Sequence, residues 1–487
     1  MSALQKFFKD TIIYGIAAIL PRAINIGLVG LHTDVFGPER YGVNTEYYVY
    51  AAYLNALLTY GMETAFFRFF SKEQEKGKII STSFISLLAT TVIFLIVGLT
   101  FAPEIAQTFG FEKVMYVKIL VWTVFLDTIV VIPFAYLRVT NRPIRFAGIK
   151  IANILFLAVL NVLFLWAIPN GILSKEILPD VLNFYVKDTP EVIYIFLANV
   201  FASFFTLLLL LPNILKIKWT FDRKILQKLL IYGSPIMIGS LAYVTNENID
   251  KLFLGDIIGK TEMGKYAACY KLGVFMTLYI TAFRLGAEPF FFNHAKEKNA
   301  KNNYATILKW FTILGAIFML VVVAYIDLFA SILIQQKQYL DALAIVPIIL
   351  LANLCLGIYN NLSIWYKLTD KTRYGMYISI FGAIVTILFN IIMIDKIGFM
   401  ASAWATLVAY GSMMIISYVL GQKHYKVPYN VKQIIGYIVL AAVLSAIAFY
   451  DGIRGNYIMA TVLVLVFLTV IYIVERKELK RLLRKGS

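Results

Sequence analysis

The chain of 487 residues has little charge, few cysteines and few histidines. Charged residues make up 15% of it, whereas a soluble domain carries about 25%, so a soluble globular protein is excluded. The two cysteines, Cys269 and Cys355, both lie in apolar stretches and exclude a fold held together by disulfides. The three histidines are scattered without the spacing of metal ligands, so we expect no metal site. There is no glycine-rich phosphate loop, and we expect no cofactor.

What the chain does have is apolar sequence, at 60% of residues and a mean hydropathy of +0.77. A helix that crosses a bilayer needs about 20 such residues. We therefore predict an all-α polytopic membrane protein with 14 transmembrane helices, the first of them too long for the apolar core of a cleaved leader. The expected segments are 11–35, 43–67, 79–102, 115–137, 146–168, 191–213, 229–254, 264–287, 305–327, 341–364, 374–394, 399–421, 433–450 and 456–475.

The positive charge follows the connections between these segments. The chain has 45 Lys and Arg against 28 Asp and Glu, a net charge of +17. If the N-terminus is cytoplasmic, the connections and ends on that side hold 29 Lys and Arg. The opposite connections hold 10, counting Lys251 and Lys265 at the ends of the adjoining segments. Basic residues accumulate on the cytoplasmic side, so we expect both termini there. The charge, including the basic tail from Arg476 to Lys485, then indicates contact with anionic lipids and not with nucleic acid.

The connections leave no room for a soluble catalytic domain. The longest on the outer side, 169–190, has 22 residues. No acid and base pair stands at a catalytic spacing, so we expect no catalytic residues and no enzyme.

Two stretches of the chain resemble each other. Residues 33–42 align with 255–264 at an offset of 222, matching one Asp and two Gly. Residues 61–67 align with 286–292 at an offset of 225, matching Gly, Glu and two Phe. An even number of helices separates the copies, which predicts two parallel six-helix repeats about an axis along the membrane normal. The expected divisions are an N-terminal lobe 1–215, a C-terminal lobe 216–425, and helices 13 and 14 with the basic tail in 426–487.

Two motifs resemble a known family. The sequence Asp250-Lys251-Leu252-Phe253-Leu254-Gly255 with 264–273 looks like the helix 7–8 signature of bacterial polysaccharide flippases, and Gly61-x-Glu63 with Phe67-Arg68-Phe69 looks like the end of their helix 2. These proteins belong to the multidrug/oligosaccharidyl-lipid/polysaccharide exporter superfamily. The resemblance implies two V-shaped lobes around a central cavity.

The resemblance also implies a function. A member of that family moves undecaprenyl-diphosphate-linked oligosaccharide from the inner to the outer leaflet of the bacterial cytoplasmic membrane by alternating access, for surface polysaccharide assembly. It implies coupling to Na⁺, H⁺ or the membrane potential, a polysaccharide polymerase as a partner, and a monomer.

Charged side chains inside the segments are the candidate substrate contacts, since each costs ~2.5–3.5 kcal/mol on insertion. Arg22 follows Pro21 near the middle of the first segment, and its guanidinium suits phosphate oxygens. We expect it to bind the diphosphate in the cavity, or else to pair with Asp127. Lys271 would add a second positive charge, unless it extends to the outer interface.

Two further groups of polar residues are candidates. Asn246 and Asp250 share one face of a helix at i,i+4, and with Asp127 they would contact a cation, a proton or the glycan, or else merely face water. Glu63, Arg68, Arg284 and Glu288 lie at the expected cytoplasmic ends of helices 2 and 8. They would form an inner gate, or else ordinary interface ion pairs. Asparagines within the segments, such as Asn153, are expected to form interhelical hydrogen bonds.

The sequence leaves two other functions open. A drug or small-cation exporter of the same superfamily would favour acids in the cavity and twelve helices. A membrane glycan polymerase or ligase would need a long outer loop with catalytic residues.

Overall fold

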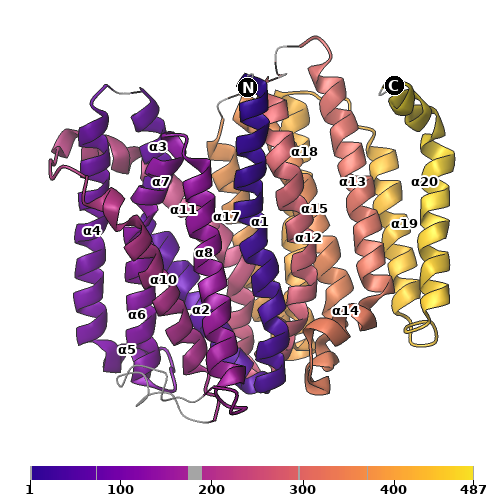
Figure 1. The fold of residues 1–487 in the computed structure, drawn as a ribbon. Helices are drawn as coiled ribbons and strands as arrows, with labels where there is room; N and C mark the ends of the chain where they lie inside the picture. The colour runs from indigo at the N-terminus through magenta and orange to yellow at the C-terminus, as the bar shows by residue number, and fades with distance from the viewer. Residues whose placement is uncertain are drawn as a thin grey trace. The chain divides into compact units, whose positions relative to one another are not determined.

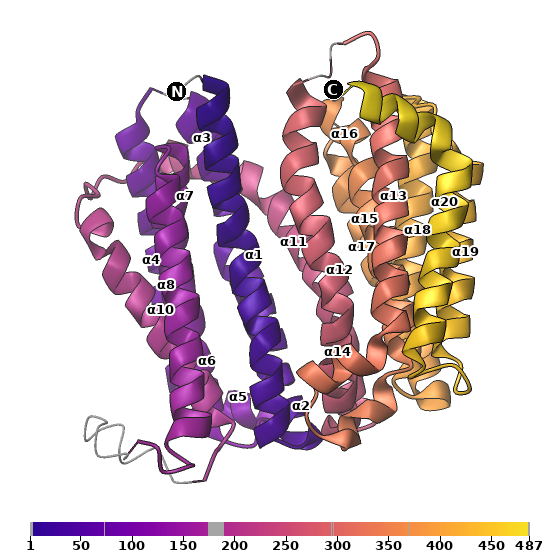
Figure 2. The same ribbon diagram turned by 45° about the vertical axis from the view of Figure 1, so that its right-hand side comes forward.

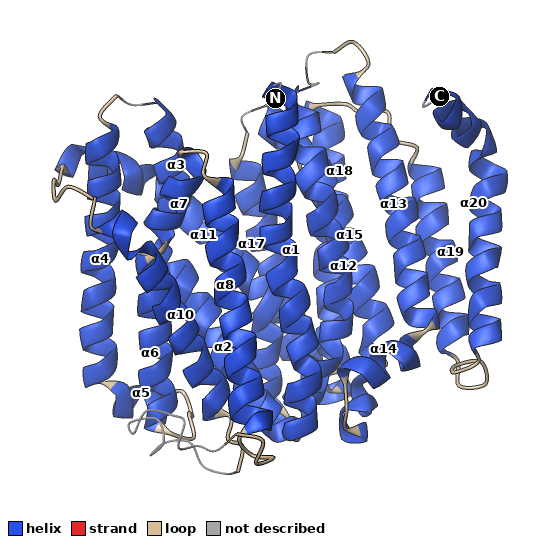
Figure 3. Ribbon diagram, viewed as in Figure 1, coloured by secondary structure: helices blue, strands red, loops and turns tan. Residues whose placement is uncertain are grey.

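The structure is a computed structural model that describes residues 3–72, 74–173, 189–293, 295, 297–369 and 371–485. Within these ranges the backbone is helical, with turns and no strands (Figure 3). The predicted all-α fold is therefore confirmed. The packing divides the chain into two units, Met1–Gly264 and Lys265–Ser487.

The first unit holds the helices from the N-terminus to the start of α12 (Figure 1). They are α1 (Ala3–Val35), α2 (Pro38–Thr59), α3 (Met62–Lys72), α4 (Lys76–Thr100), α5 (Ala102–Thr108), α6 (Val114–Ile129), α7 (Val131–Val139), α8 (Pro143–Val162) with a π-helical turn (Leu163–Ala167), α10 (Ile193–Ile214) and α11 (Arg223–Ile257).

The second unit begins within α12 and runs to the C-terminus. Its helices are α12 (Lys260–Asn293), α13 (Ala300–Ala324), α14 (Ile326–Leu333), a 3₁₀ turn (Lys337–Ala342), α15 (Ile345–Leu362), α16 (Ile364–Leu368), α17 (Arg373–Ile397), α18 (Met400–His424), α19 (Val431–Phe449) and α20 (Tyr457–Lys485).

Among the described residues, thirteen helices are long and apolar enough to cross a membrane. The one expected segment without such a helix is 43–67, the second along the chain. It falls on α2 and α3 and is not one continuous helix. α2 ends at Thr59, and Tyr60 and Gly61 follow with positive φ angles of 32° and 71°. A residue in this conformation ends a helix, and glycine adopts it without strain. α2 also carries Glu39, Arg40 and Glu46, which explains why it is less apolar than the thirteen.

Polar residues join the helices of the first unit at a few buried points. His32 on α1 and Asn161 on α8 share a hydrogen bond of 2.8 Å, and Asn153 on α8 donates to Thr206 on α10 at 2.9 Å. The ring of Tyr47 stacks on Phe196 with centroids 3.8 Å apart. The asparagine bonds confirm the predicted interhelical role, and they tie α1, α8 and α10 into one bundle.

The start of α11 is fixed by its own cap. The Asp222 carboxylate accepts hydrogen bonds from the backbone N–H of Lys224 at 2.9 Å and of Ile225 at 3.1 Å. These two hydrogen bonds lower the pKa of the Asp222 carboxyl below its ordinary value, and the bond from Ile225 has the larger effect. From this cap α11 runs against α2, α3 and α4. α11 therefore packs in the first unit, although we expected it to open the C-terminal lobe. The division of the chain by six-helix repeats stays a prediction.

Two aligned glycines of the expected repeat meet in the first unit. A β-carbon on Gly42 would lie 2.2 Å from the carbonyl oxygen of Lys260, and one on Gly264 would lie 1.8 Å from that of Pro38. Pro38 begins α2 and Lys260 begins α12, so the start of each helix packs against the glycine of the other. At the offset of 222, Pro38 aligns with Lys260 and Gly42 with Gly264. The contact is thus reciprocal, as a local two-fold axis would make it.

In the second unit, α18 packs between α15 and α17, and α13 packs against α15, α19 and α20. Figure 2 shows α13, α19 and α20 side by side. Arg454, in the connection from α19 to α20, donates to both carboxylate oxygens of Asp327 on α14, with Nε 3.0 Å from Oδ1 and 3.1 Å from Oδ2. This bidentate pair fixes that connection to α14.

Candidate functional site

Arg22, the strongest sequence candidate, lies on a continuous helix. α1 runs through Pro21 without a break, and Arg22 is thirteen residues before its end at Val35, about 20 Å at 1.5 Å per residue. The side chain is exposed on the surface of the first unit. A guanidinium within a spanning helix has the fork of donors that suits phosphate oxygens.

Asp127 has its own partners, and Arg22 is not among them. The hydroxyl of Ser203 on α10 donates to Asp127 Oδ1 on α6 at 2.6 Å. Lys150 on α8 is close enough to attract the same carboxylate, and its Nζ lies 4.3 Å from the centre of the Phe134 ring. The structure therefore favours Asp127 as part of a network among α6, α8 and α10 over the alternative pair with Arg22. Sequence reasoning did not single out Lys150, although it is one of few lysines inside an apolar segment.

Asn246 and Asp250 lie on one buried face of α11, as their spacing predicts, with 2% and 1% of their surfaces exposed. The carboxylate of Asp250 forms a salt bridge of 3.0 Å with Lys251, the next residue. Lys251 Nζ also donates to the carbonyl oxygen of Glu247 at 2.6 Å. A cation bound at Asp250 would have to replace an ammonium group that is already in contact.

The proposed gate residues of the first unit have different partners. Glu63 pairs with Arg138 on α7 at 3.0 Å, with both side chains about half exposed. The guanidinium of Arg68 stacks over the ring of Tyr232 on α11 at 4.3 Å. An ion pair as exposed as Glu63–Arg138 contributes at most about 1 kcal/mol, so it could open during a conformational change at little cost.

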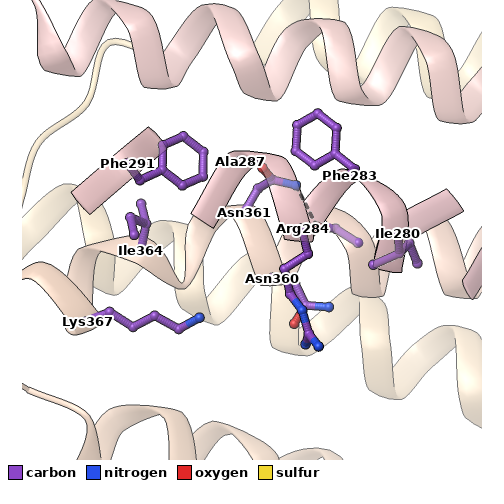
Figure 4. A pocket seen from close by; sticks show the side chains of 10 residues that line it. Ile280, Phe283, Arg284, Ala287, Phe291, Asn360, Asn361, Ile364 and Lys367 are labelled. Atoms are coloured by element: carbon purple, nitrogen blue, oxygen red, sulfur yellow. Dashed lines mark hydrogen bonds between the residues drawn. The ribbon is translucent and has the colours of Figure 1, made fainter. Parts of the chain in front are cut away.

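In the second unit a cleft collects cationic and amide side chains. It has a volume of about 330 Å³ and lies between α12, α15 and α16. Arg284, Asn360 and Lys367 line it together with Phe283 and Phe291. In Figure 4 the Arg284 and Asn360 side chains extend to the same side, and the amine of Lys367 points toward them. Among the described residues, the lining has cations, amides and rings but no acid, which suits an anionic or hydroxylated ligand.

The remaining predicted residues add nothing to this cleft. Lys271 lies on α12 and is half-buried. The side chain of Glu288 lies outside the part of the chain that the structure describes. No group of three or more His, Cys, Asp or Glu within metal-binding reach occurs among the described residues.

Comparison with known proteins identifies the family of this chain. The family described as polysaccharide biosynthesis protein matches residues 7–293, more than half of the chain. The chain belongs to this family. A second family, MatE, matches residues 235–392. No protein of curated function matches the chain in sequence.

Three solved structures show that this member of the family has a known fold. The lipid II flippase MurJ in an inward closed conformation superimposes with a TM-score of 0.71 at 16% identity, over 95% of this chain and 99% of MurJ. An inward-facing multidrug resistance MATE transporter gives 0.67 at 13% identity, over 85% and 97%. A transporter of the same superfamily from Pyrococcus furiosus gives 0.57 at 15% identity, over 85% and 95%. The chain is a multi-pass membrane protein with the fold that MurJ and the MATE transporters share.

Proposed function

We propose that this protein is a flippase that moves undecaprenyl-diphosphate-linked oligosaccharide from the inner to the outer leaflet by alternating access. Its family is named for polysaccharide biosynthesis, and it shares its fold with a lipid II flippase. Transport, and not catalysis, is the activity that a bundle of spanning helices with short connections supports.

The sign of the accessible charge supports this substrate most directly. Arg22 in α1 and Arg284 in α12 are both exposed within spanning helices. The acids nearest to the middle of helices, Asp127 and Asp250, are already engaged by Ser203 and Lys251. Guanidinium groups bind diphosphate oxygens in a bidentate manner, whereas a cationic drug would need acids that are free to pair.

The match to the MatE family favours a second candidate, a multidrug or small-cation exporter of the same superfamily. For either function we place the protein in the cytoplasmic membrane with both termini in the cytoplasm. We propose coupling to Na⁺, H⁺ or the membrane potential, action as a monomer, and delivery of the glycan to a polymerase.

Depletion of the protein tests the substrate. We expect a diphosphate-linked glycolipid to accumulate on the cytoplasmic side, since its synthesis continues while its export stops. Mass spectrometry of the lipid extract would identify the glycan. Unchanged glycolipids together with new sensitivity to cationic dyes would support the exporter and contradict the flippase.

Arg22→Ala is expected to reduce surface polysaccharide at least tenfold in depleted cells that express the variant. Loss of hydrogen bonds to a charged group costs about 1.5–3 kcal/mol, and about 1.4 kcal/mol corresponds to a factor of ten. Arg22→Lys keeps the charge and should retain part of the activity. Lys118→Ala, which removes another exposed cation within a span, is the matched control and should resemble the wild type. Full activity of Arg22→Ala at equal protein level would rule out a diphosphate contact.

A further inference from the structure

A second basic site lies in the first unit, away from the mid-helix residues discussed above. It is a cleft of about 1010 Å³ between the starts of α4 and α8, the helix α7 and the end of α10. We call it the basic cleft. The polar residues in its described lining are Tyr136, Lys76, Arg142, Arg145, Asn213, Lys216 and Lys218.

The charge of the basic cleft is of one sign. Of the lining residues that the structure describes, five are Lys or Arg and none is Asp or Glu. Glu75, which directly precedes Lys76, forms its salt bridge of 2.7 Å with Lys78 instead. Among the described residues, Arg142, Arg145 and Lys216 have no acidic partner within salt-bridge distance. Such a concentration of unneutralised cations at a membrane surface calls for an anion.

A buried acceptor lies beside these cations. The Oδ1 atom of Asn213 is buried and has no hydrogen-bond partner among the described residues, and Asn213 is one of the residues that line the basic cleft. Buried acceptors are nearly always paired. A ligand that offers a hydroxyl donor next to its negative charge would satisfy this oxygen, and a glycerol headgroup does so.

The surroundings of the basic cleft are those of a membrane interface. The segment that supplies Lys216 and Lys218 also carries Leu215, Trp219 and Phe221, which are 75%, 69% and 54% exposed. Exposed tryptophan next to lysine is typical of the headgroup level, where the ring and the lysine stems lie along acyl chains. A soluble anion would gain nothing from these apolar side chains, whereas a phospholipid would contact both.

We infer that the basic cleft binds the phosphodiester headgroup of an anionic phospholipid of the phosphatidylglycerol type. The Arg and Lys side chains contact the phosphate, Asn213 accepts a bond from a glycerol hydroxyl, and the acyl chains lie along Leu215 and Trp219. The site lies wholly within the first unit, so it is independent of which substrate the protein transports.

Lipid binding to the purified full-length protein tests the assignment. Native mass spectrometry would titrate phosphatidylglycerol, with phosphatidylcholine as the neutral comparison. The test variant combines Arg142→Gln, Arg145→Gln and Lys216→Gln. We expect its affinity for phosphatidylglycerol to fall at least tenfold and its preference over phosphatidylcholine to disappear. These side chains are exposed, so the variant should fold, and thermal unfolding in detergent alone would verify this.

The matched control removes cations from a neighbouring pocket that also contains acids. Lys224 and Lys228 line that pocket together with Glu75 and Asp222, so Lys224→Gln with Lys228→Gln should leave phosphatidylglycerol binding unchanged. The charge-conserving pair Arg142→Lys and Arg145→Lys should retain it. Wild-type affinity of the triple Gln variant would overturn the proposal. Displacement of the lipid by an equal concentration of glycerol 3-phosphate would also overturn it, because the site would then bind a soluble anion.

Discussion

Replacing Gly264 with alanine is expected to destabilise the protein by about 3 kcal/mol. The new methyl group would lie 1.8 Å from the carbonyl oxygen of Pro38, well inside the contact distance. The obstacle is backbone and not a flexible side chain, so α2 and α12 would have to separate. Overpacking of this kind typically costs about 1–3 kcal/mol or more. Thermal unfolding in detergent, followed by size-exclusion chromatography, would measure the fall in Tm.

Gly239→Ala is the control for Gly264→Ala. Gly239 lies within α11, and a β-carbon there would meet no atom within 4 Å. Alanine favours a helix interior by about 1 kcal/mol over glycine, so this variant should be as stable as the wild type or more stable. Gly42→Ala should behave like Gly264→Ala, because its methyl group would lie 2.2 Å from the oxygen of Lys260. Equal Tm values for Gly264→Ala and Gly239→Ala would contradict the close contact.

The glycine contact also shows what could be predicted from the sequence about the fold. The alignment of 33–42 with 255–264 singled out Gly42 and Gly264 from local pattern alone. The pattern could not show that the two positions touch, because they are 222 residues apart. The spans were predicted well for a related reason: a bilayer requires long apolar helices, and these are visible along the chain. Only α2 differed from the predicted spans, because its polar residues find partners within the protein. Glu46, for example, pairs with Lys260 at 3.0 Å.

Charge partners were harder to predict than helices. Asp127 and Asp250 were singled out as acids within helices, but their partners were not foreseen. Ser203 belongs to another helix, and Lys251 was counted with a connection although its Nζ reaches back to Asp250. The sequence shows that burying these charges costs free energy, but it does not show which contacts offset that cost. The basic cleft was missed for the same reason, because Lys76, Arg142 and Lys216 belong to three different connections.

A buried ion cluster in the second unit was also missed. Lys309 Nζ on α13 lies 2.7 Å from Glu475 Oε2 on α20 and also contacts Glu478. The hydroxyl of Tyr437 on α19 donates to Glu475 Oε1 at 2.7 Å, and Trp310 Nε1 donates to Glu478 at 3.1 Å. Lys309 is an isolated lysine inside an apolar segment, which was the available indication. Its partners are 166 and 169 residues away, so no local pattern connects them.

Lys309→Met is expected to destabilise the second unit by about 3–5 kcal/mol. Removing one member of a buried ion pair leaves the other charge uncompensated, and Glu475 is only 4% exposed. Glu478→Gln should cost about 1 kcal/mol or less, because this side chain is 30% exposed and Glu475 still neutralises the lysine. Arg476→Met, which removes an exposed cation from the same helix, is the control and should leave Tm unchanged. Thermal unfolding in detergent would rank the three variants.

The double variant Lys309→Met with Glu475→Gln separates charge from packing. If the cost of Lys309→Met comes from the uncompensated carboxylate, the double variant should be more stable than the single one, because neutral groups of similar size often replace a buried pair at little cost. Equal or greater destabilisation would mean instead that the lysine stem and the hydrogen bonds of Tyr437 hold α19 and α20 against α13. The first result would assign the attachment of the two C-terminal helices to apolar packing, with the ion cluster fixing only their register.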